Sequence, residues 1–478
     1  MENASEKLKG IYTRLFANKY YIFLFGFIII TLPSLIRGFY LHGQESYFYY
    51  RISDFIINNG IPNYDFLSFG GRAFLYNLGS SLFLVLTNLL GIGLNNLLVF
   101  LPLVFGFLSL ILFYNILKFF KFSNNILSFA CYILILSPAF LYTFTQFTSF
   151  TVPLFLNLLG FFLITRKKII FHYLAFVVYL ILPMFRFVHI LFGLLILLFY
   201  FYKIEKLKKF LPYSAIILLT IYLNNLFVGF GLDIIPHSFY ELFFDFGGTY
   251  GLSIFLLFLA FFGLTKLWAE KYKHLFYYLF FVLSILIIAL NIKYLIYFNL
   301  ILCILAALGL RHIYQLKWSS KLIRNLTVML LIIGVLFSGL SFLIENSKKD
   351  VDDNLYDALM FLKSRTSPRG VIFSHEKYGI YINTISQRKN FIDFNYAYAP
   401  RLDLRLFYLD KIYYSRDLTK VLDIFKEFRV SHILITPEMK DGLVWNTNNN
   451  GLLFLLKNNP DNFNLIYNNN GYEIWGIS

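Results

Sequence analysis

Residues 20–37 read YYIFLFGFIIITLPSLIR, and residues 42–60, shortly after them, read HGQESYFYYRISDFIINNG. The first stretch is apolar over about the length that an α-helix needs to cross the hydrocarbon core of a bilayer. Within the second stretch, residues 47–59 place apolar side chains on one helical face and polar side chains on the other. That pattern is typical of a helix that lies in the membrane interface. The sequence therefore predicts a membrane span followed by an interfacial helix.

The rest of the chain extends this pattern over most of its 478 residues, of which 58% are hydrophobic and only 14% are charged. Because a soluble domain carries about 25% charged residues, the composition excludes a soluble enzyme or a disordered chain as the whole molecule. Eleven stretches are predicted to span the membrane: about 20–37, 95–117, 126–142, 150–165, 169–185, 187–202, 211–230, 251–265, 275–290, 294–310 and 326–344. A further run, 73–90, is interrupted by Asn77, Gly79 and two serines.

The formal net charge of +16 lies mainly between the apolar stretches. Residues 1–344 hold 25 Lys and Arg against 10 Asp and Glu. If 73–90 does not cross, 20 of those 25 basic residues fall on one side, as the positive-inside rule requires. We therefore expect a multi-pass protein of the cell membrane with a cytoplasmic N-terminus, a retained first span and an outer C-terminal domain. The charge indicates topology, and no nucleic-acid partner is expected.

The outer loops gather most of the acidic residues of the membrane part. Loop 38–94 is predicted to hold two interfacial helices, 47–59 and 73–90, and loop 231–250 follows a later span. Six acidic residues fall in these two loops: Glu45, Asp54, Asp65, Asp233, Glu241 and Asp245. They indicate either a functional site on the outer face or an avoidance of the basic inner face.

Residues 346–478 are predicted to form an α/β domain, because helical and strand patterns alternate along them. Asp352 or Asp353 is expected to cap one helix and Ser415 another. Strands are predicted at 370–374, 391–393 and 432–436, and loops at the asparagine-rich stretches 446–450 and 468–470. The domains are thus 1–345 and 346–478. The simplest role for the second is a cap that faces a partner or an acceptor.

The segments 20–37, 47–59 and 73–90 together resemble the shared module of the GT-C superfamily of membrane glycosyltransferases. Many members carry an acidic pair after the first span, where this chain has Gln44-Glu45-Ser46. The sequences 62–65, 137–138, 241–251 and 291–294 resemble further outer segments of the archaeal oligosaccharyltransferase relatives, the dolichyl-phosphooligosaccharide–protein glycosyltransferases. Of their Trp-Trp-Asp-Tyr-Gly motif, only Tyr378-Gly379 is present, so the sequence does not support recognition of an Asn-x-Ser/Thr acceptor.

The resemblance implies transfer of a sugar or oligosaccharide from a polyprenyl-phosphate-linked donor to a glycan or protein acceptor. Glu45 is then the first candidate for the catalytic base, and a surface or helix-capping role is the alternative. Lys293 and Arg186 are candidates for binding the donor phosphate, and snorkelling to lipid headgroups is the alternative. Glu241 and Asp245 are further catalytic candidates. Other candidates are Asp65, His189 and Tyr378, although a lone histidine in a span is more often a core residue.

Whether Mg²⁺ or Mn²⁺ is a cofactor stays open. Gln44-Glu45-Ser46 holds one carboxylate, whereas Mg²⁺ or Mn²⁺ prefers several oxygen ligands, so no residue is assigned to a metal. Arg51 and Asp54, three residues apart on a helix, are expected to form a structural pair. Two other functions stay open: a catalytically degenerate relative that binds lipid-linked glycan, and a transporter or flippase. Membrane lipid is an expected partner in each case.

Overall fold

The computed structural model describes residues 18–203, 213–215, 218, 222, 252–268, 278, 282–283, 285–286, 294–396, 398–447 and 449–478. The chain divides into two compact units. The helical unit contains Asn77–Lys348 and the residues up to Leu41, and the composite unit joins His42–Tyr76 to Lys349–Ser478. By these contacts, most of the loop after the first predicted span belongs with the C-terminal residues.

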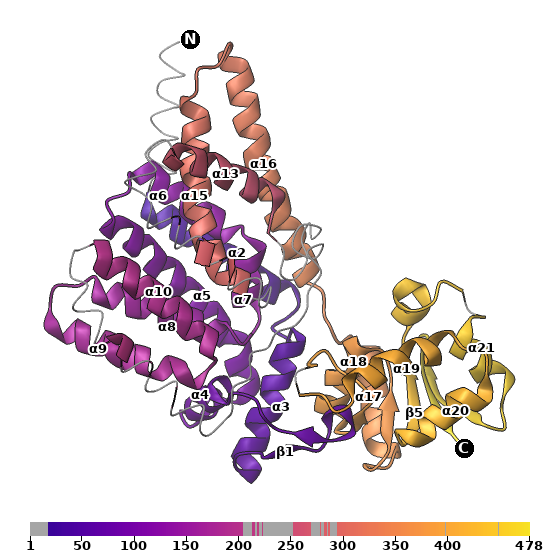
Figure 1. Ribbon diagram of the computed structural model, residues 1–478. Helices are drawn as coiled ribbons and strands as arrows, with labels where there is room; N and C mark the ends of the chain where they lie inside the picture. The colour runs from indigo at the N-terminus through magenta and orange to yellow at the C-terminus, as the bar shows by residue number, and fades with distance from the viewer. Residues whose placement is uncertain are drawn as a thin grey trace. The chain divides into compact units, whose positions relative to one another are not determined.

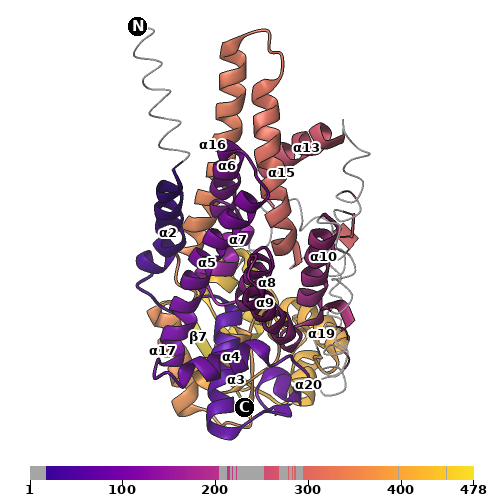
Figure 2. The same cartoon turned by 90° about the vertical axis from the view of Figure 1, so that its left-hand side faces the viewer.

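In the residues that the structure describes, the helical unit is built of helices (Figure 1). Its described helices are α2 (Lys19–Ile36), α4 (Gly79–Asn88), α5 (Leu94–Phe119), α6 (Asn124–Ile135), α7 (Pro138–Thr145), α8 (Thr151–Ile164), α9 (Ile169–Ile181), η2 (Leu182–Met184), α10 (Phe187–Lys203), α13 (Ile254–Trp268), α15 (Leu295–Gln315) and α16 (Lys321–Asn346). Figure 2 shows α13 crossing beside the long pair α15 and α16, with which it packs.

Four of these helices, α2, α5, α15 and α16, are long and apolar enough to cross a membrane. The pair α6 and α7, bent by 60°, gives a fifth span if it is counted as one. A multi-pass membrane protein is therefore confirmed, whereas the number eleven stays a prediction. The predicted spans 211–230 and 275–290 lie largely outside the described residues, and loop 231–250 lies wholly outside them.

The bend between α6 and α7 has a local cause. Pro138 stands at the first position of α7, where its missing N–H costs no helical hydrogen bond. In a continuous helix the same proline would remove a hydrogen bond and clash with the preceding turn. Ser137, just before it, adopts an extended backbone and donates its hydroxyl to Asn299 Oδ1 on α15 over 2.8 Å. The break thus places a polar contact inside the helical unit.

The predicted interfacial helix 73–90 was too long at its start. Helix α4 begins at Gly79, because residues 72–73 form strand β2 (Arg72–Ala73), which pairs antiparallel with β1 (Tyr64–Asp65). The preceding helix α3 (Gln44–Asn59) and the turn η1 (Ser68–Gly70) complete the loop part of the composite unit.

The C-terminal part of the composite unit is a five-stranded mixed sheet with the order β4-β3-β5-β7-β6. The strands are β3 (Val371–Phe373), β4 (Lys389–Asn390), β5 (Val430–Ile435), β6 (Phe463–Asn469) and β7 (Tyr472–Ile477). The helices are α17 (Asp353–Arg365), α18 (Glu376–Tyr381), η6 (Ile382–Ser386), α19 (Leu402–Tyr414), α20 (Leu418–Glu427), η7 (Met439–Leu443) and α21 (Gly451–Asn458). Helix α17 packs on β6 and β7, and α20 packs on β5. The sheet-containing C-terminal region is therefore confirmed.

Several details of that region differ from the sequence-based prediction. The strand predicted at 391–393 is β4 at Lys389–Asn390, and Asp417 instead of Ser415 caps α20 through its contact with the Lys420 N–H. Residues 468–470 are the end of β6 and its turn into β7, not a free loop. Asparagine is uncommon in strands, but here the antiparallel partner β7 supplies the hydrogen bonds that hold the backbone extended.

Candidate functional site

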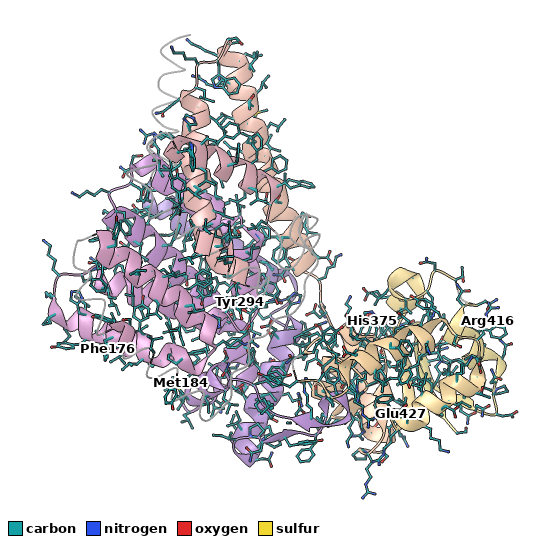
Figure 3. The ribbon with its side chains drawn as sticks, in the orientation of Figure 1. Phe176, Met184, Tyr294, His375, Arg416 and Glu427 are labelled. Atoms are coloured by element: carbon teal, nitrogen blue, oxygen red, sulfur yellow. The ribbon has the colours of Figure 1, made fainter. Side chains whose placement is uncertain are left out.

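The residues selected from the sequence fall into three groups. Glu45, Asp65 and Tyr378 lie in the composite unit. Arg186 and His189 lie in the helical unit, and Figure 3 labels Met184, which stands two residues before Arg186 in the chain. The other three candidates, Glu241, Asp245 and Lys293, lie outside the described residues, and their roles stay predictions.

Glu45 occupies the first turn of α3 and is only 8% exposed. A carboxylate in the first turn is stabilised by the partial positive charge at a helix N-terminus. The placement fits both interpretations of this residue, because a base and a capping residue each need a carboxylate held at a defined position. Glu45 stays the first candidate for the base.

The start of α3 is fixed by residues that follow Lys349 in the chain. The Gly43 N–H donates to Asp350 Oδ2 over 2.6 Å, and His42 Nδ1 lies 3.0 Å from the same oxygen. Gln44 Nε2 donates to the Lys377 carbonyl over 3.1 Å. Figure 1 shows α3 beside α18, which carries Lys377. The turn that bears Glu45 is thus built jointly by two distant parts of the sequence.

Asp65 forms the centre of a buried ion pair. Arg51 Nη1 and Nη2 donate to its two carboxylate oxygens over 2.6 and 2.7 Å, and Arg72 Nε lies 3.9 Å away. Burial alone would raise the pKa of Asp65, but the two guanidinium groups and the Leu67 N–H outweigh it and lower the pKa from 3.8 to about 2. The carboxylate therefore stays ionised and holds the β1–β2 turn against α3.

The predicted pairing of Arg51 with Asp54 was wrong. Arg51 reaches Asp65, fourteen residues further on, while Asp54 accepts a hydrogen bond from the Asn58 side chain. Surface pairs within one helix contribute little, whereas the β1–β2 hairpin brings Asp65 into a buried position with two-point geometry. Such bidentate pairs are the stronger ones.

A second buried polar cluster, the Asp393 cluster, fastens the η1 turn. Ser68 Oγ donates to Asp393 Oδ2, and Asn390 Nδ2 reaches the same oxygen over 3.0 Å. The Phe69 N–H donates to Asn390 Oδ1 over 2.7 Å, and Arg405 Nη2 donates to the Phe69 carbonyl over 2.8 Å. The loop 42–76 is therefore held at both ends by the C-terminal residues.

Tyr378, in the segment that resembles part of the oligosaccharyltransferase motif, is engaged with Glu438. Its hydroxyl donates to Glu438 Oε2 over 2.6 Å, and Lys377 Nζ lies 2.6 Å from Oε1. Burial, together with this hydrogen bond, raises the pKa of Tyr378, so the phenol stays a donor. Burial would raise the pKa of Glu438 as well, but the bonds from Lys377 and Tyr378 lower it. The carboxylate thus remains charged.

His189 lies in the core of the helical unit, fully buried in the first turn of α10. Its Nδ1 lies 2.9 Å from the Tyr297 hydroxyl on α15, and its carbonyl accepts the side-chain amide of Asn157 from α8 over 3.2 Å. The ring of Phe150 packs edge-on against the imidazole at 5.1 Å. Arg186 directly precedes α10, where its carbonyl accepts the His189 N–H. These contacts tie three helices together and fit the core alternative, and a functional role of His189 stays a prediction.

Within the part of the chain that the structure describes, no three His, Cys, Asp or Glu side chains are grouped so that they could hold a metal ion. Mg²⁺ or Mn²⁺ would want several oxygen ligands, and those residues do not supply them around Glu45.

No sequence pattern indicated that Asp350, Asn390, Asp393 or Arg405 would contact loop 42–76. All four contact loop 42–76 across more than 300 residues of chain. Their types are ordinary in a soluble α/β domain, and only the pairing of two distant segments reveals their role. The one usable sign was the polar run that starts at residue 345, immediately after the last predicted span.

Neither a protein-family model nor a curated protein matches the sequence. Solved structures do match the fold. Archaeal oligosaccharyltransferase AglB from Archaeoglobus fulgidus, in complex with an inhibitory peptide and a dolichol-phosphate, matches with a TM-score of 0.55 and 13% identity, over 87% of this chain and 70% of that one. An oligosaccharyltransferase from Archaeoglobus fulgidus tethered with an acceptor peptide matches with a TM-score of 0.54 and 12% identity, over 88% of this chain and 70% of that one.

ArnT from Cupriavidus metallidurans bound to undecaprenyl phosphate matches over 95% of this chain and 97% of that one. The TM-score is 0.51 and the identity 10%. Identity this low carries the fold alone, but two different proteins of the same superfamily match nearly the whole chain. The resemblance seen in residues 20–90 is thereby confirmed at the level of architecture: the chain has the fold of the GT-C membrane glycosyltransferases.

Proposed function

We propose that the chain is a membrane glycosyltransferase that transfers a sugar or oligosaccharide from a polyprenyl-phosphate-linked donor to an acceptor on the outer face. The observation that carries the proposal is the likeness in fold to two proteins captured with a polyprenyl phosphate. One is bound to dolichol-phosphate and the other to undecaprenyl phosphate, and the likeness extends over 87% and 95% of this chain.

The proposed reaction assigns the acceptor proton to Glu45. The carboxylate takes the proton as the acceptor atom attacks the sugar, and the bond between the sugar and the phosphate oxygen breaks. Its burial at the start of α3 supports this role, because a general base must be held at a fixed position. Glu241 and Asp245 are the further acids assigned to the same task.

The leaving phosphate needs cations, and Lys293 and Arg186 are assigned to it. Charge that develops on the phosphate is stabilised by positively charged groups already in place. Arg186 supports the assignment by its position directly before α10, at an end of that apolar helix. Basic side chains at such boundaries are costly to keep and are by default functional.

The acceptor is proposed to be a glycan or a protein, and the composite unit is proposed to lie on the outer side with the N-terminus in the cytoplasm. The charge distribution supports this orientation. The Tyr378 hydroxyl and Lys377 are occupied by Glu438. The tryptophans and the aspartate of the sequon motif are also replaced in this chain. Together these features favour an acceptor other than the Asn-x-Ser/Thr sequon.

A catalytically degenerate protein that binds lipid-linked glycan is the second candidate. The single carboxylate in Gln44-Glu45-Ser46 favours it, since many relatives carry two acids there. The transporter or flippase alternative has weaker support, because the sequence carries no recognisable internal repeat.

The test is a transfer assay with the full chain reconstituted in liposomes. Radiolabelled sugars linked to undecaprenyl or dolichyl phosphate or diphosphate are offered with a mixture of glycan and peptide acceptors. A glycosyltransferase releases the sugar from the lipid and yields a labelled acceptor. Donor that stays intact but co-purifies with the protein indicates the degenerate binder, and donor that only changes leaflet indicates a flippase; either result contradicts the proposal.

A further inference from the structure

Helix α3 begins without a capping side chain of its own. Its N-cap residue is Gly43, with a φ of 84°, a backbone conformation that glycine adopts without strain. Glycine has no side chain to accept the free N–H groups of the first turn, and no side-chain cap is formed there. The third residue of the helix, Ser46, donates its own N–H to the Gly43 carbonyl. The local sequence therefore supplies a weak start for the turn that carries Glu45.

Asp350 provides the missing carboxylate from 307 residues away. Its Oδ2 accepts the Gly43 N–H over 2.6 Å, which is the bond that a Glu three residues into a helix makes in an ordinary capping box. The same oxygen lies 3.0 Å from His42 Nδ1, and the Tyr381 hydroxyl also hydrogen-bonds to this carboxyl group. A negative charge at this place is also favoured by the helix dipole.

Further contacts from the C-terminal segment fix the same turn. The Gln44 side chain donates to the Lys377 carbonyl over 3.1 Å, and Thr384 Oγ1 donates to the Tyr47 carbonyl over 3.3 Å. The rings of Tyr47 and Tyr381 meet edge-on with their centroids 4.9 Å apart. Glu45 is thus flanked by residues whose positions are set from α18 and η6.

We infer that Asp350 is a positioning residue for Glu45, and that the C-terminal α/β segment is the scaffold of this turn in addition to any acceptor-facing role. The inference rests on the proposed function where it concerns turnover. Asp350 itself does not need to touch a substrate, because it acts through the Gly43 N–H and the first turn of α3. Without the Asp350 carboxylate, Glu45 is still present and can still accept a proton, but its side chain should be poorly oriented.

The structural arm of the test measures amide hydrogen exchange in the full chain in detergent. Asp350→Ala should speed exchange of the amides of residues 43–48 about ten-fold, the factor expected when one helix cap is lost. Asp350→Asn keeps an oxygen acceptor, so its exchange rate at residues 43–48 should lie between those of Asp350→Ala and the wild type. Asp357→Ala, an exposed aspartate on α17, is the matched control and should change nothing in this segment. Wild-type exchange at 43–48 in both Asp350 variants overturns the inference.

The activity arm uses the donor on which the wild-type protein is active in the liposome assay. Asp350→Ala should lower kcat about ten-fold or more with little change in KM for the donor, because orientation and not donor binding is lost. Asp350→Asn should recover part of kcat. If Asp350→Ala does not fold, Asp350→Asn alone decides, and wild-type exchange and kcat in that variant overturn the inference. Should the wild type transfer nothing from any donor, the proposed function fails while the exchange arm still decides the role of Asp350.

Discussion

Asp65 is the residue on which the geometry of loop 42–76 depends most directly. It accepts two hydrogen bonds from Arg51 and lies near Arg72, and all three side chains are largely shielded from solvent. A buried pair of this kind is costly to break, because removing one partner leaves the other charge uncompensated. Its role in the structure is therefore to lock α3 to the β1–β2 hairpin.

Replacing Asp65 with Asn should destabilise the protein at about pH 7 by about 2 kcal/mol. The pKa of Asp65 is lowered from 3.8 to about 2 on folding. A lowered carboxyl pKa stabilises the fold above the unfolded pKa, and this contribution is lost as the pH falls through the folded value. The difference between wild type and variant should therefore shrink between about pH 4 and pH 2.

Thermal unfolding followed by tryptophan fluorescence measures this difference, since Trp445 and Trp475 lie in the composite unit. Asp54→Asn is the matched control, because Asp54 accepts hydrogen bonds from Asn58 on the same helix and takes no part in the ion pair of Asp65. An equal loss of stability in both variants, or a difference that is independent of pH, contradicts the ion-pair role.

At the scale of single residues, sequence reasoning could place Glu45 but not its supports. Glu45 stands out because it is an acid at the end of an apolar span. Asp350 and Arg405 are each more than 300 residues away from their partners in loop 42–76 along the chain. No local spacing in the sequence encodes such contacts. The same limit explains why Arg51 was wrongly paired with Asp54. Its actual partner, Asp65, lies in the two-residue strand β1, which the sequence did not predict.

Between elements, the contact of α13 with α15 is set by two glycines. A Cβ added at Gly263 or Gly309 would overlap the backbone of the other helix, at Leu305 and Leu259 respectively. Glycine lets the two backbones approach closely, which is a common means of helix association in membranes. No larger residue fits at either position without separating the helices.

Gly309→Leu should therefore lower the stability of the helical unit by about 1–3 kcal/mol, the usual cost of overpacking. The measurement is the midpoint of thermal unfolding of the purified protein in detergent. Gly93→Ala serves as the control, because no atom lies within 4 Å of a Cβ added there and its φ is −58°. A Gly309→Leu variant as stable as the control would show that the two helices do not pack as described.

The elements themselves were predictable to different degrees. The apolar stretches of α2, α5, α15 and α16 are visible in the sequence because a span needs a long uninterrupted run. The hairpin of β6 and β7 was missed, because Asn464, Asn468 and Asn469 lower the strand signal of β6. Its stability comes from pairing with β7 and from the contact of Tyr467 with Phe361 on α17, which are tertiary effects.

For the whole molecule, the orientation in the membrane follows from the distribution of basic residues and is open to direct measurement. The two native cysteines, Cys131 and Cys303, are fully buried. A single cysteine introduced at an exposed position can therefore be labelled without much background from the native thiols.

A membrane-impermeant maleimide should label Ser364→Cys on α17 in intact cells, because the composite unit is proposed to face outward. Lys167→Cys, in the exposed link between α8 and α9, should react only after the cells are permeabilised. Labelling in the opposite order would contradict the orientation derived from the charge bias. If neither variant is labelled, both labelling reactions are repeated on the unfolded protein, where each introduced thiol must react.

At this scale the architecture was the most predictable feature, because a membrane limits the elements to apolar helices and the loop after the first span is distinctive. The assembly of loop 42–76 with the C-terminal residues was not predictable, since it depends on side chains such as Asp393 and Asn390 that have no special spacing. The sequence-based division at residue 345 keeps that loop with the membrane spans, whereas the contacts join it to the C-terminal part.

The proposal that Glu45 takes the acceptor proton in a glycosyl transfer is tested by measuring the turnover of Glu45→Gln in the liposome assay. We expect transfer to fall by about 10²-fold or more, while the variant still folds, inserts in the membrane and binds the donor. Glu427→Gln, at an exposed glutamate on α20 that is marked in Figure 3, should retain wild-type turnover. Wild-type turnover in Glu45→Gln would show that Glu45 does not take the acceptor proton.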